Sequence, residues 1–424
     1  MTILVVGASG LIGNAILHAL RAVGYAARGA SRSRPAAETA SSWLELPFEA
    51  LETPSAWVPF LHDVHVVINC IGIISEQQVG DFDRLHSRIP QALFAACEQG
   101  GVQQVIQLSA LGARVDASTP YWRSKAAADQ DLLSRHLRAT VVRPSLVYGE
   151  GGASTRLFRL LSTLPVLCLP YAQQAQVQPV HVADLAEAVV NLVRQPEHAP
   201  RELAAVGPRA MSLAEYLQEL AKGMKLPAPR IFSLPIILAK PLAWLASLKA
   251  RSALTPDSLI MLAESATGSN TADCAAMRHA LARPLRDPQS FTAPAQRANA
   301  VLDWALPALQ YALAFLWLWT AYVSWFVWPQ AESQAWLQAC GIPASWTDET
   351  LLAAVLLDAA IGLRLLWRPP RWLWLGQLLL VLAYTILLSV CLPTFWQHPF
   401  GPVSKNLPLI VLFALCWRLS DNKV

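Results

Sequence analysis

One stretch of this chain is too long and too apolar for the surface of a soluble protein. Residues 372–392 read WLWLGQLLLVLAYTILLSVCL and contain no charged side chain. A helix needs about 20 apolar residues to cross the hydrocarbon core of a bilayer, so this stretch predicts a transmembrane helix. Three further apolar segments, at about 303–328, 350–368 and 406–419, extend the prediction to a bundle of four spanning helices, although the last is short and contains Pro408.

The charges between these segments predict how the bundle is oriented. The 329–349 loop contains acidic residues and no Lys or Arg, whereas the 364–372 turn contains three arginines. Because positive residues mark the cytoplasmic side of a membrane, we expect both termini in the cytoplasm. The first residues, MTILVVGASG, also lack the basic region of a secretory signal. The chain is therefore predicted to be a multi-pass protein of the inner (cytoplasmic) membrane, in contact with the lipid bilayer.

One acidic residue interrupts the second apolar segment. Asp358 lies in the middle of TLLAAVLLDAAIGLRLLW, where a carboxylate costs about 2.5–3.5 kcal/mol on insertion scales. Such a residue usually faces the interior of a bundle. A functional role and a role in packing against a polar group of another helix are both compatible with this position.

The first 300 residues follow a different pattern, in which short apolar strands alternate with longer helical segments. The strand-like runs include HVVINCIG (65–72), VIQLSA (105–110) and TVVRPSLVYG (140–149). Fully apolar strands separated by helices indicate a parallel sheet covered on both faces, with ligands at the carboxyl ends of the strands. The predicted fold class is α/β, a doubly wound parallel-sheet Rossmann domain with a small cap, followed by an α-helical transmembrane bundle.

This change of pattern also divides the chain. We expect a dinucleotide-binding domain at 1–225, cap or linker helices at 226–300, and the membrane bundle at 301–424. The segment 231–250 is apolar but is broken by Pro235 and Pro241, so it is either a cap over the substrate or a helix in the membrane interface.

Composition and cysteine spacing exclude several classes of function. The formal net charge is only +4, and no Lys/Arg-rich run accompanies exposed aromatic residues, so no nucleic acid is expected as a partner. The seven cysteines form no CxxC pair and no cluster with histidine. This spacing indicates reduced, mostly buried thiols, and predicts neither a metal site nor a disulfide framework.

A glycine-rich loop directly follows the first strand. In GASGLIG, Gly7 permits a tight turn, Gly10 permits backbone to approach a pyrophosphate, and Gly13 permits close packing of the first helix on the strand. The helix N-terminus offers free N–H groups to an anion. We therefore predict that a dinucleotide contacts the whole loop: Gly7, Ala8, Ser9, Gly10, Leu11, Ile12 and Gly13.

The end of the second strand predicts which dinucleotide is bound. An acidic residue there would hold the ribose hydroxyls of NAD, whereas arginine accommodates the 2′-phosphate of NADP. The stretch ARGASRSRP (27–35) contains Arg28, Arg32 and Arg34, and no acid follows until Glu38. NADP(H) is thus favoured over NAD(H), with Arg32 as its contact, although the arginines could also form an ordinary solvated loop.

Several motifs resemble those of a known superfamily. The first 290 or so residues resemble the atypical/extended short-chain dehydrogenases/reductases, and within them the branch that includes the NAD(P)H-binding accessory subunit of respiratory complex I. The C-terminal 120 or so residues resemble a DoxX-like four-helix membrane domain. The motifs that carry the first resemblance are GASGLIG (7–13), NCIG (69–72), LSALGA (108–113), YWRSK (121–125), RPSLVYG (143–149) and QPVHVADLAEAV (178–189).

The resemblance implies roles for individual residues. Ser109, Tyr121 and Lys125 match the catalytic Ser, Tyr and Lys, and Lys125 also matches a ribose contact. The chemistry is reasonable by itself, because a lysine one helical turn from a tyrosine can stabilise its phenolate. Pro120 directly precedes Tyr121 and could alter how the tyrosine enters its helix. The remaining matches lie on the nicotinamide side of the cofactor: Asn69, Gly72, Pro144 and Ser145.

Two functions follow from these features. The first is an NADP(H)-dependent oxidoreductase or epimerase-like enzyme acting on a membrane-associated quinone, lipid or polyprenyl substrate. The second is a non-catalytic module that binds the nucleotide for assembly or redox sensing and docks onto a membrane complex. His181 is a further candidate acid–base group, but a residue at this place more often orders the loop that leads into a helix.

Overall fold

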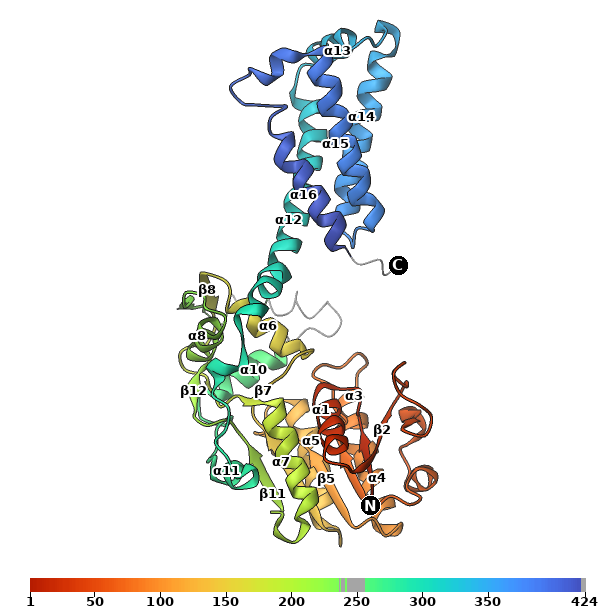
Figure 1. The fold of residues 1–424 in the computed structure, drawn as a ribbon, viewed down its shortest axis with the longest axis vertical. Coiled ribbons are helices and arrows are strands. Elements are labelled where there is room, and N and C mark those ends of the chain that lie inside the picture. Colours follow the sequence, from red (N-terminus) through yellow and green to blue (C-terminus); the bar gives the residue numbers. More distant parts are fainter. Residues whose placement is uncertain (236, 238–240, 242–255, 421–424) are drawn as a thin grey trace. The chain divides into compact units, whose positions relative to one another are not determined.

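The computed structural model describes residues 1–420 apart from 236, 238–240 and 242–255 (Figure 1). The chain divides into two compact units, Met1–Ala300 and Val301–Val424, which are described separately.

A seven-stranded sheet forms the centre of the first unit. Each pair of neighbouring strands in it is parallel, as the apolar strand pattern predicts. From β1 the chain first adds strands on one side of the sheet, β2 and β3, and then crosses to add β4 and the later strands on the other side. The carboxyl ends of β1 and β4 therefore lie at the switch point where such sheets bind ligands. The strands, in spatial order, are β11 (Glu202–Ala205), β6 (Ala139–Pro144), β5 (Gln104–Leu108), β4 (Val66–Asn69), β1 (Thr2–Val6), β2 (Ala26–Ser31) and β3 (Trp43–Glu45).

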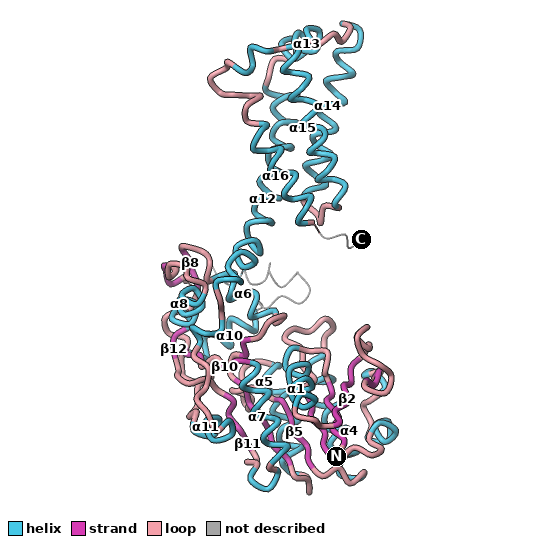
Figure 2. Tube along the Cα trace, in the orientation of Figure 1, coloured by secondary structure: helices cyan, strands magenta, loops and turns pink. Residues whose placement is uncertain are grey.

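Helices cover both faces of this sheet (Figure 2). On one face α1 (Leu11–Ala22) and α7 (Val182–Arg194) pack their apolar sides against the strands. On the other face α4 (Ile89–Gln99) and α5 (Pro120–Ser134) do the same. The predicted three-layer, doubly wound domain is confirmed.

The edge strand β3 explains why the sequence around it shows no clear motif. Trp43 of β3 lies beside Gly29 of β2, and a Cβ on Gly29 would come within 2.4 Å of the Trp43 ring. The indole thus occupies the space that a side chain on β2 would take. A three-residue strand anchored by one tryptophan has too little periodicity to be recognised from sequence.

Smaller elements form a lobe with its own apolar cluster, which includes Tyr148, Tyr216 and Phe291. Part of the segment 231–250 belongs to β13, and its residues 236, 238–240 and 242–250 lie outside the described residues. Among the described residues, the lobe contains these two-stranded sheets and helices: β7 (Val147–Tyr148) with β10 (Val180–His181), β8 (Val166–Leu169) with β13 (Arg230–Ser233), β9 (Gln176–Val177) with β12 (Met211–Ser212), and α6 (Ala153–Leu161), α8 (Leu213–Gly223), α10 (Pro256–Ser265) and α11 (Ala275–Leu281).

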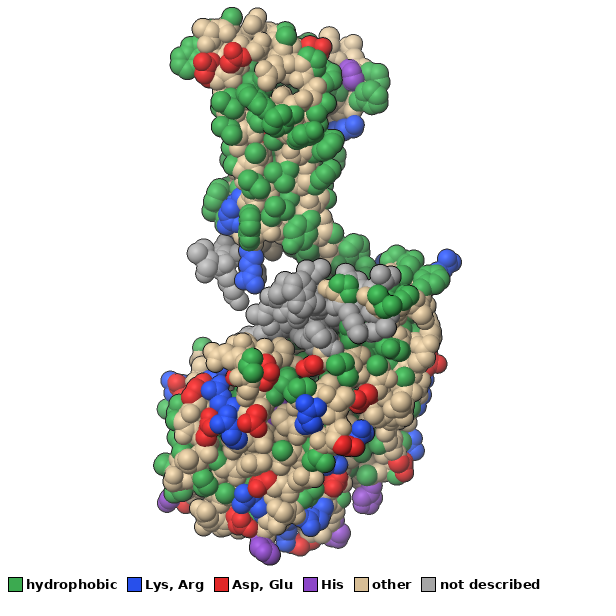
Figure 3. Space-filling view, turned by 180° about the vertical axis from the view of Figure 1, so that it is seen from behind, with side chains coloured by type: hydrophobic (Ala, Val, Ile, Leu, Met, Phe, Trp, Pro, Cys, Tyr) green, Lys and Arg blue, Asp and Glu red, His purple; other side chains and the backbone are tan. Residues whose placement is uncertain are grey.

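The second unit is helical, and on the face seen in Figure 3 apolar side chains cover its middle, between two ends that carry charged side chains. Two helices, Pro294–Val327 and Arg371–Cys391, are long and apolar enough to cross a membrane, and Asn406–Leu419 is a shorter apolar helix. The four predicted apolar segments coincide with helices, and the structure adds a short fifth helix, α13. The helices are α12 (Arg297–Tyr322, continued by a π-helical turn at Val323–Val327), α13 (Gln330–Ala339), α14 (Thr347–Leu365), α15 (Arg371–Cys391) and α16 (Asn406–Leu419).

Close packing and a few polar groups mark the interior of the bundle. A Cβ on Gly362 would come within 2.7 Å of the Leu318 side chain, so α14 and α12 approach closely there. The indole of Trp317 donates a 2.8 Å hydrogen bond to Gln377 on α15. Asp358 is buried, as expected, and its Oδ1 has no hydrogen-bond partner among the described residues.

Candidate functional site

The predicted glycine loop connects β1 to α1 at the switch point of the sheet. Gly7 has a φ of +79°, in the left-handed region that favours glycine, and a Cβ there would come within 2.8 Å of the Cys70 backbone. A Cβ on Gly13 would come within 2.4 Å of the Gly7 carbonyl oxygen. Two of the three glycines are therefore required by the backbone itself, which places α1 directly against the turn.

The start of α1 fits a dinucleotide pyrophosphate. Gly10 is the N-cap and supplies no side chain to the helix terminus, so the first-turn N–H groups of Leu11, Ile12 and Gly13 have no side-chain cap. These donors and the positive end of the helix dipole suit a diphosphate. Leu11 also faces the lobe, because a Cβ on Gly152 would come within 2.9 Å of its side chain. The glycine loop therefore lies where the sheet and the lobe meet.

Arg32 follows the strand that contacts this loop. The amides of Gly7 and Ala8 both donate to the carbonyl of Ala30, at 2.8 and 3.1 Å, which holds the end of β2 beside the loop. Arg32 is exposed and forms no ion pair or hydrogen bond within the described residues. Glu38, the first acid after β2, is ion-paired with Arg21 at 2.7 Å, and this hydrogen-bonded pairing lowers the pKa of its carboxyl.

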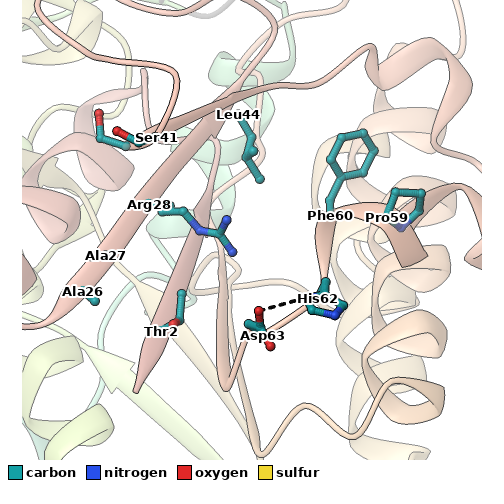
Figure 4. A pocket seen from close by; sticks show the side chains of 11 residues that line it. Thr2, Ala26, Ala27, Arg28, Ser41, Leu44, Pro59, Phe60, His62 and Asp63 are labelled. Carbon is teal, nitrogen blue, oxygen red and sulfur yellow. Dashed lines mark hydrogen bonds and ion pairs between the residues drawn. The ribbon is translucent and has the colours of Figure 1, made fainter.

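The other two arginines of this stretch point elsewhere. Arg34 pairs with Glu45 at 4.0 Å. Arg28 extends into a cavity of about 560 Å³ that Thr2, His62 and others line (Figure 4). Thr2 begins β1, so this cavity lies at the amino ends of the strands, away from the glycine loop. Of the three arginines in this stretch, Arg32, the predicted cofactor contact, is the one that follows the end of β2 and has no ion-pair partner among the described residues.

Tyr121 and Lys125 lie one turn apart on α5, as their spacing predicts. Pro120 occupies the first position of the helix, where its missing N–H is tolerated, so it does not disturb the entry of Tyr121. The Lys125 ammonium lies 6.0 Å from the centre of the Tyr121 ring and donates to the Leu108 carbonyl at 3.2 Å. A Cβ on Gly72 would come within 3.4 Å of Lys125 Nζ, so Gly72 joins this pair at the site.

Burial sets the protonation of this pair. It raises the pKa of the Tyr121 phenol to about 12. Burial also lowers the pKa of Lys125 to about 8, although the nearby Asp129 carboxylate favours the ammonium. Lys125 is therefore a group that can lose or gain a proton close to neutral pH.

His86 is a site residue that the sequence did not identify. Its Nε2 accepts a hydrogen bond from the Ile73 amide at 3.0 Å, and its Nδ1 lies 3.1 Å from the Ser124 hydroxyl. Burial, and secondarily the Lys125 charge, hold its pKa well below the usual value, so the ring is neutral. Its ring stands edge-on to Tyr121 at 5.4 Å. His86 therefore joins the Gly72 loop to α5, and its spacing in the sequence gave no signal of this.

Ser109 directly follows β5, and its hydroxyl is bonded to an acid. Its hydroxyl donates to Asp129 at 2.6 Å, and Arg143 lies 3.3 Å from the same oxygen. Burial raises the pKa of the Asp129 carboxyl. Of the three predicted catalytic residues, the structure brings Tyr121 and Lys125 together, whereas the Ser109 proton is directed to Asp129, which lies one helical turn beyond Lys125.

The remaining predicted contacts lie at the carboxyl ends of β4 and β6. Asn69 is fully buried, donates to Gln107 at 2.7 Å, and accepts from the Ile71 amide at 3.2 Å. It orders the turn that carries Gly72. Pro144 ends β6, and Ser145 beyond it donates to Asn270 at 3.0 Å. The lobe therefore reaches the site through Asn270.

His181 orders a helix start. Its Nδ1 accepts a hydrogen bond from the Ala183 amide at 3.2 Å, so it caps α7. Burial lowers its pKa, and its ring packs 5.3 Å from Phe291. These contacts favour the loop-ordering role over an acid–base role.

Comparison with known families assigns both parts of the chain. Residues 3–207 match the NAD dependent epimerase/dehydratase family, and residues 314–414 match the DoxX-like family. The chain joins an NAD dependent epimerase/dehydratase domain to a DoxX-like domain. This confirms the resemblance found in the sequence. The first family binds a nicotinamide dinucleotide, and the second domain, with its two long apolar helices, indicates a membrane protein.

Two curated relatives show what the first domain is similar to. NADH dehydrogenase (ubiquinone) 1 alpha subcomplex subunit 9 of Mus musculus is 31% identical over 147 residues, which are 34% of this chain and 38% of that protein. Ceramide reductase of Caulobacter vibrioides is 28% identical over 236 residues, which are 54% of this chain and 73% of that protein. The chain thus spans well under half of the first relative.

Solved structures confirm the fold of the first unit. A nucleoside-diphosphate-sugar epimerase from Staphylococcus aureus aligns with a TM-score of 0.56 at 16% identity, covering 69% of this chain and 99% of its own. MoeE5 in complex with UDP-glucuronic acid and NAD aligns with a TM-score of 0.52 at 21% identity, covering 71% of this chain and 100% of its own. At these identities the likeness concerns the fold alone.

Proposed function

We propose that this chain is a membrane-anchored, NADP(H)-dependent oxidoreductase that acts on a membrane-associated quinone, lipid or polyprenyl substrate. The observation that carries the proposal is the pair of Tyr121 and Lys125 beside Gly72, at the end of the sheet that holds the dinucleotide loop. When bound, the nicotinamide supplies or accepts a hydride.

The chain's own residues handle the proton. The Tyr121 phenol gives a proton to a substrate oxygen, or takes one in the reverse direction. Lys125, whose pKa burial lowers to about 8, can pass a proton to the phenolate that remains, because its own proton is held weakly. His86 holds the ring of Tyr121 and the Gly72 loop in place without taking up charge.

The preference for NADP(H) rests on Arg32 and Glu38. Arg32 is exposed beside the loop, and the carboxylate that would hold ribose hydroxyls is already paired with Arg21. A 2′-phosphate would supply a negatively charged partner for the Arg32 guanidinium, which has none among the described residues. We expect Arg32→Ala to weaken NADPH binding about 10-fold or more, corresponding to about 1.4 kcal/mol, with NADH binding little changed. Arg34→Ala, which breaks an exposed ion pair with Glu45, is the matched control.

The membrane domain supports the substrate class and the orientation. Lys and Arg gather at one end of the bundle, at Arg364, Arg368, Arg371 and Arg418, whereas the end that contains Glu332 and Asp348 has Lys405. This pattern favours both termini in the cytoplasm. A site tethered to the bilayer meets lipid substrates at high local concentration, and a relative covered over 73% of its length is named for a lipid, ceramide.

The test is consumption of NADPH by the purified full-length protein supplied with a membrane lipid extract. Tyr121→Phe and Lys125→Ala should lower turnover by roughly 100-fold or more, while NADPH binding persists. Tyr25→Phe, which lies outside the site, serves as the control. Turnover that survives both substitutions would show that the pair is not the proton-transfer group.

One observation favours a second function, a non-catalytic nucleotide-binding module of a membrane complex. Ser109 directs its proton to Asp129, and the pKa of Tyr121 is about 12, an arrangement that suits a scaffold as well as an active site. The complex I subunit among the relatives points the same way. In that case NADPH should raise the unfolding temperature, and no extract should support its consumption.

A further inference from the structure

Two cysteines that lie far apart in the sequence meet at one end of the helical unit. Cys340 follows α13, and Cys391 is the last residue of α15. Burial, and secondly the neighbouring Cys391 thiol, raise the pKa of the Cys340 thiol. Both cysteines are free thiols in the structure, and both side chains are half-buried. By contrast, Cys97 and Cys416 are buried and Cys168 is exposed, so the expectation of mostly buried thiols holds for only part of the set.

Aromatic packing fixes the two segments against each other. The Trp336 ring, on α13, stacks on Trp328 at 5.8 Å and meets Phe395 edge-on at 5.5 Å. Phe395 belongs to the short turn Pro393–Trp396 that directly follows Cys391. Because Trp336 and Phe395 lie four residues from Cys340 and Cys391 respectively, these ring contacts hold the two segments that carry the cysteines against each other.

The charges around this end indicate the compartment that it faces. This end carries Glu332 in the first turn of α13 and Asp348 and Glu349 in the first turn of α14, against one basic residue, Lys405. The four arginines of the unit lie at the other end. With the topology proposed above, the two thiols face the non-cytoplasmic side of the inner membrane. That side is oxidising, and disulfides persist there.

We propose that Cys340 and Cys391 form a disulfide bond that closes the non-cytoplasmic end of the bundle. This inference rests on the proposed topology.

The bond forms by thiol–disulfide exchange with a disulfide-carrying oxidase of that compartment. One cysteine thiolate attacks the donor disulfide and releases one donor thiol, giving a mixed disulfide. The second cysteine thiolate then displaces the other donor thiol. Cys340 and Cys391 lose two protons and two electrons in total, and the donor leaves as a dithiol.

The bond would join α13 to α15. The short helix α13 is the element that the apolar pattern did not predict, because its sequence QAESQAWLQA is polar for a membrane segment. Its packing depends on the Trp336 contacts. A covalent link at its end keeps this polar helix over the end of the spanning helices.

The experiment uses the full-length chain in membranes from intact cells. Free thiols are blocked in SDS with a small maleimide, the sample is reduced, and newly exposed thiols are labelled with a polymer-linked maleimide that shifts the gel band. Two thiols should be labelled in the wild type, and none in Cys340→Ser or Cys391→Ser. Cys168→Ser, which removes an exposed cysteine of the first unit, should still show two.

A C-terminal reporter that is active only in the cytoplasm measures the topology separately. If the reporter is active and no thiol is labelled after reduction, the disulfide is disproved while the topology stands. If the reporter is inactive and no thiol is labelled, both are disproved. Peptide mapping that finds either cysteine bonded to a different partner also overturns the inference.

Discussion

Lys125 and Asp358 are both buried ionisable residues, yet their surroundings differ. Lys125, in the first unit, donates to the Leu108 carbonyl and lies near Asp129 and the Tyr121 ring. Asp358, in the second unit, has an oxygen without a hydrogen-bond partner among the described residues. The first unit surrounds its buried charge with polar groups, whereas in the described part of the second unit no hydrogen-bond partner reaches Asp358 Oδ1.

This difference shows how each site can be used. A buried group with partners retains its charge at moderate cost, and it can exchange a proton when that cost brings its pKa near neutrality. A buried carboxyl without partners is costly in whichever state it is held. The first arrangement is typical of an active site, whereas the second is a weak point of the bundle unless a ligand or another group supplies the missing hydrogen bond.

Replacing Lys125 gives the largest effect and tests the first half of this comparison. In Lys125→Met, turnover should fall by roughly 100-fold or more, and yet the protein without nucleotide should be more stable at pH 7. The pKa of the native Lys125 side chain falls from 10.5 to about 8 on folding. This shift corresponds to about 3 kcal/mol of stability that the native lysine costs the folded protein. Thermal unfolding of the purified full-length protein measures this, and a lower unfolding temperature would show that the ammonium is well compensated.

The pH dependence of stability tests the same cost with the native residue. Because the folded pKa is lower than the unfolded value, the unfolded state binds more protons between about pH 8 and 10.5. The free energy of unfolding should therefore rise with pH across this window, by up to about 1.4 kcal/mol per pH unit. Lys125→Met serves as the control, and its stability should lack this component. Equal slopes in the two proteins would assign the effect to other groups.

His86 offers a smaller test of the partnered site. His86→Phe keeps an aromatic ring beside Tyr121 but removes the acceptor for the Ile73 amide. A buried donor left without a partner costs about 1–3 kcal/mol, and we expect a loss of stability in that range. His65→Phe is a less suitable control because His65 accepts from the Thr2 amide, so the exposed His62 is the better choice. A variant as stable as the wild type would mean that water replaces the imidazole.

Asp358→Asn should have the smallest effect. An amide removes the charge, although it also needs partners, so we expect stabilisation of the bundle by about 1 kcal/mol and unchanged turnover. Stability is measured by unfolding in detergent, with Asp348→Asn at an exposed position as the control. Lost turnover, or a less stable bundle, would show that the native carboxylate meets a partner that this chain does not supply.

The fold could be predicted from the sequence where the physical signal is local. The apolar run VVIN forms β4, as its pattern predicts. In the loop GASGLIG, the structure confirms that the backbone requires glycine at Gly7 and Gly13. The pairing of Tyr121 with Lys125 followed from one helical turn. In contrast, β3 depends on the fit of Trp43 over Gly29, a contact between strands that no local pattern records.

The site was less predictable because its supporting contacts are distant in the sequence. His86 reaches Ser124, and Ser145 reaches Asn270 across 125 positions. The sequence could not show that the hydroxyl of Ser109, a predicted catalytic residue, donates to Asp129. Arg28 and Arg32 lie four residues apart, yet Arg28 extends into the cavity at the amino ends of the strands, whereas Arg32 follows the carboxyl end of β2. Charge counting cannot distinguish these two positions.

The pairing of Glu38 with Arg21 has a consequence for cofactor engineering. In Rossmann-type sites an acid after the second strand holds the ribose of NAD, whereas an arginine nearby accommodates the 2′-phosphate of NADP. Here that acid is already bound by two guanidinium nitrogens and by Ser42. Removing Arg32 would therefore leave a protein with poor affinity for either cofactor. Conversion to NAD would require a new carboxylate at the end of β2, while the Arg21–Glu38 pair is kept to hold the following loop.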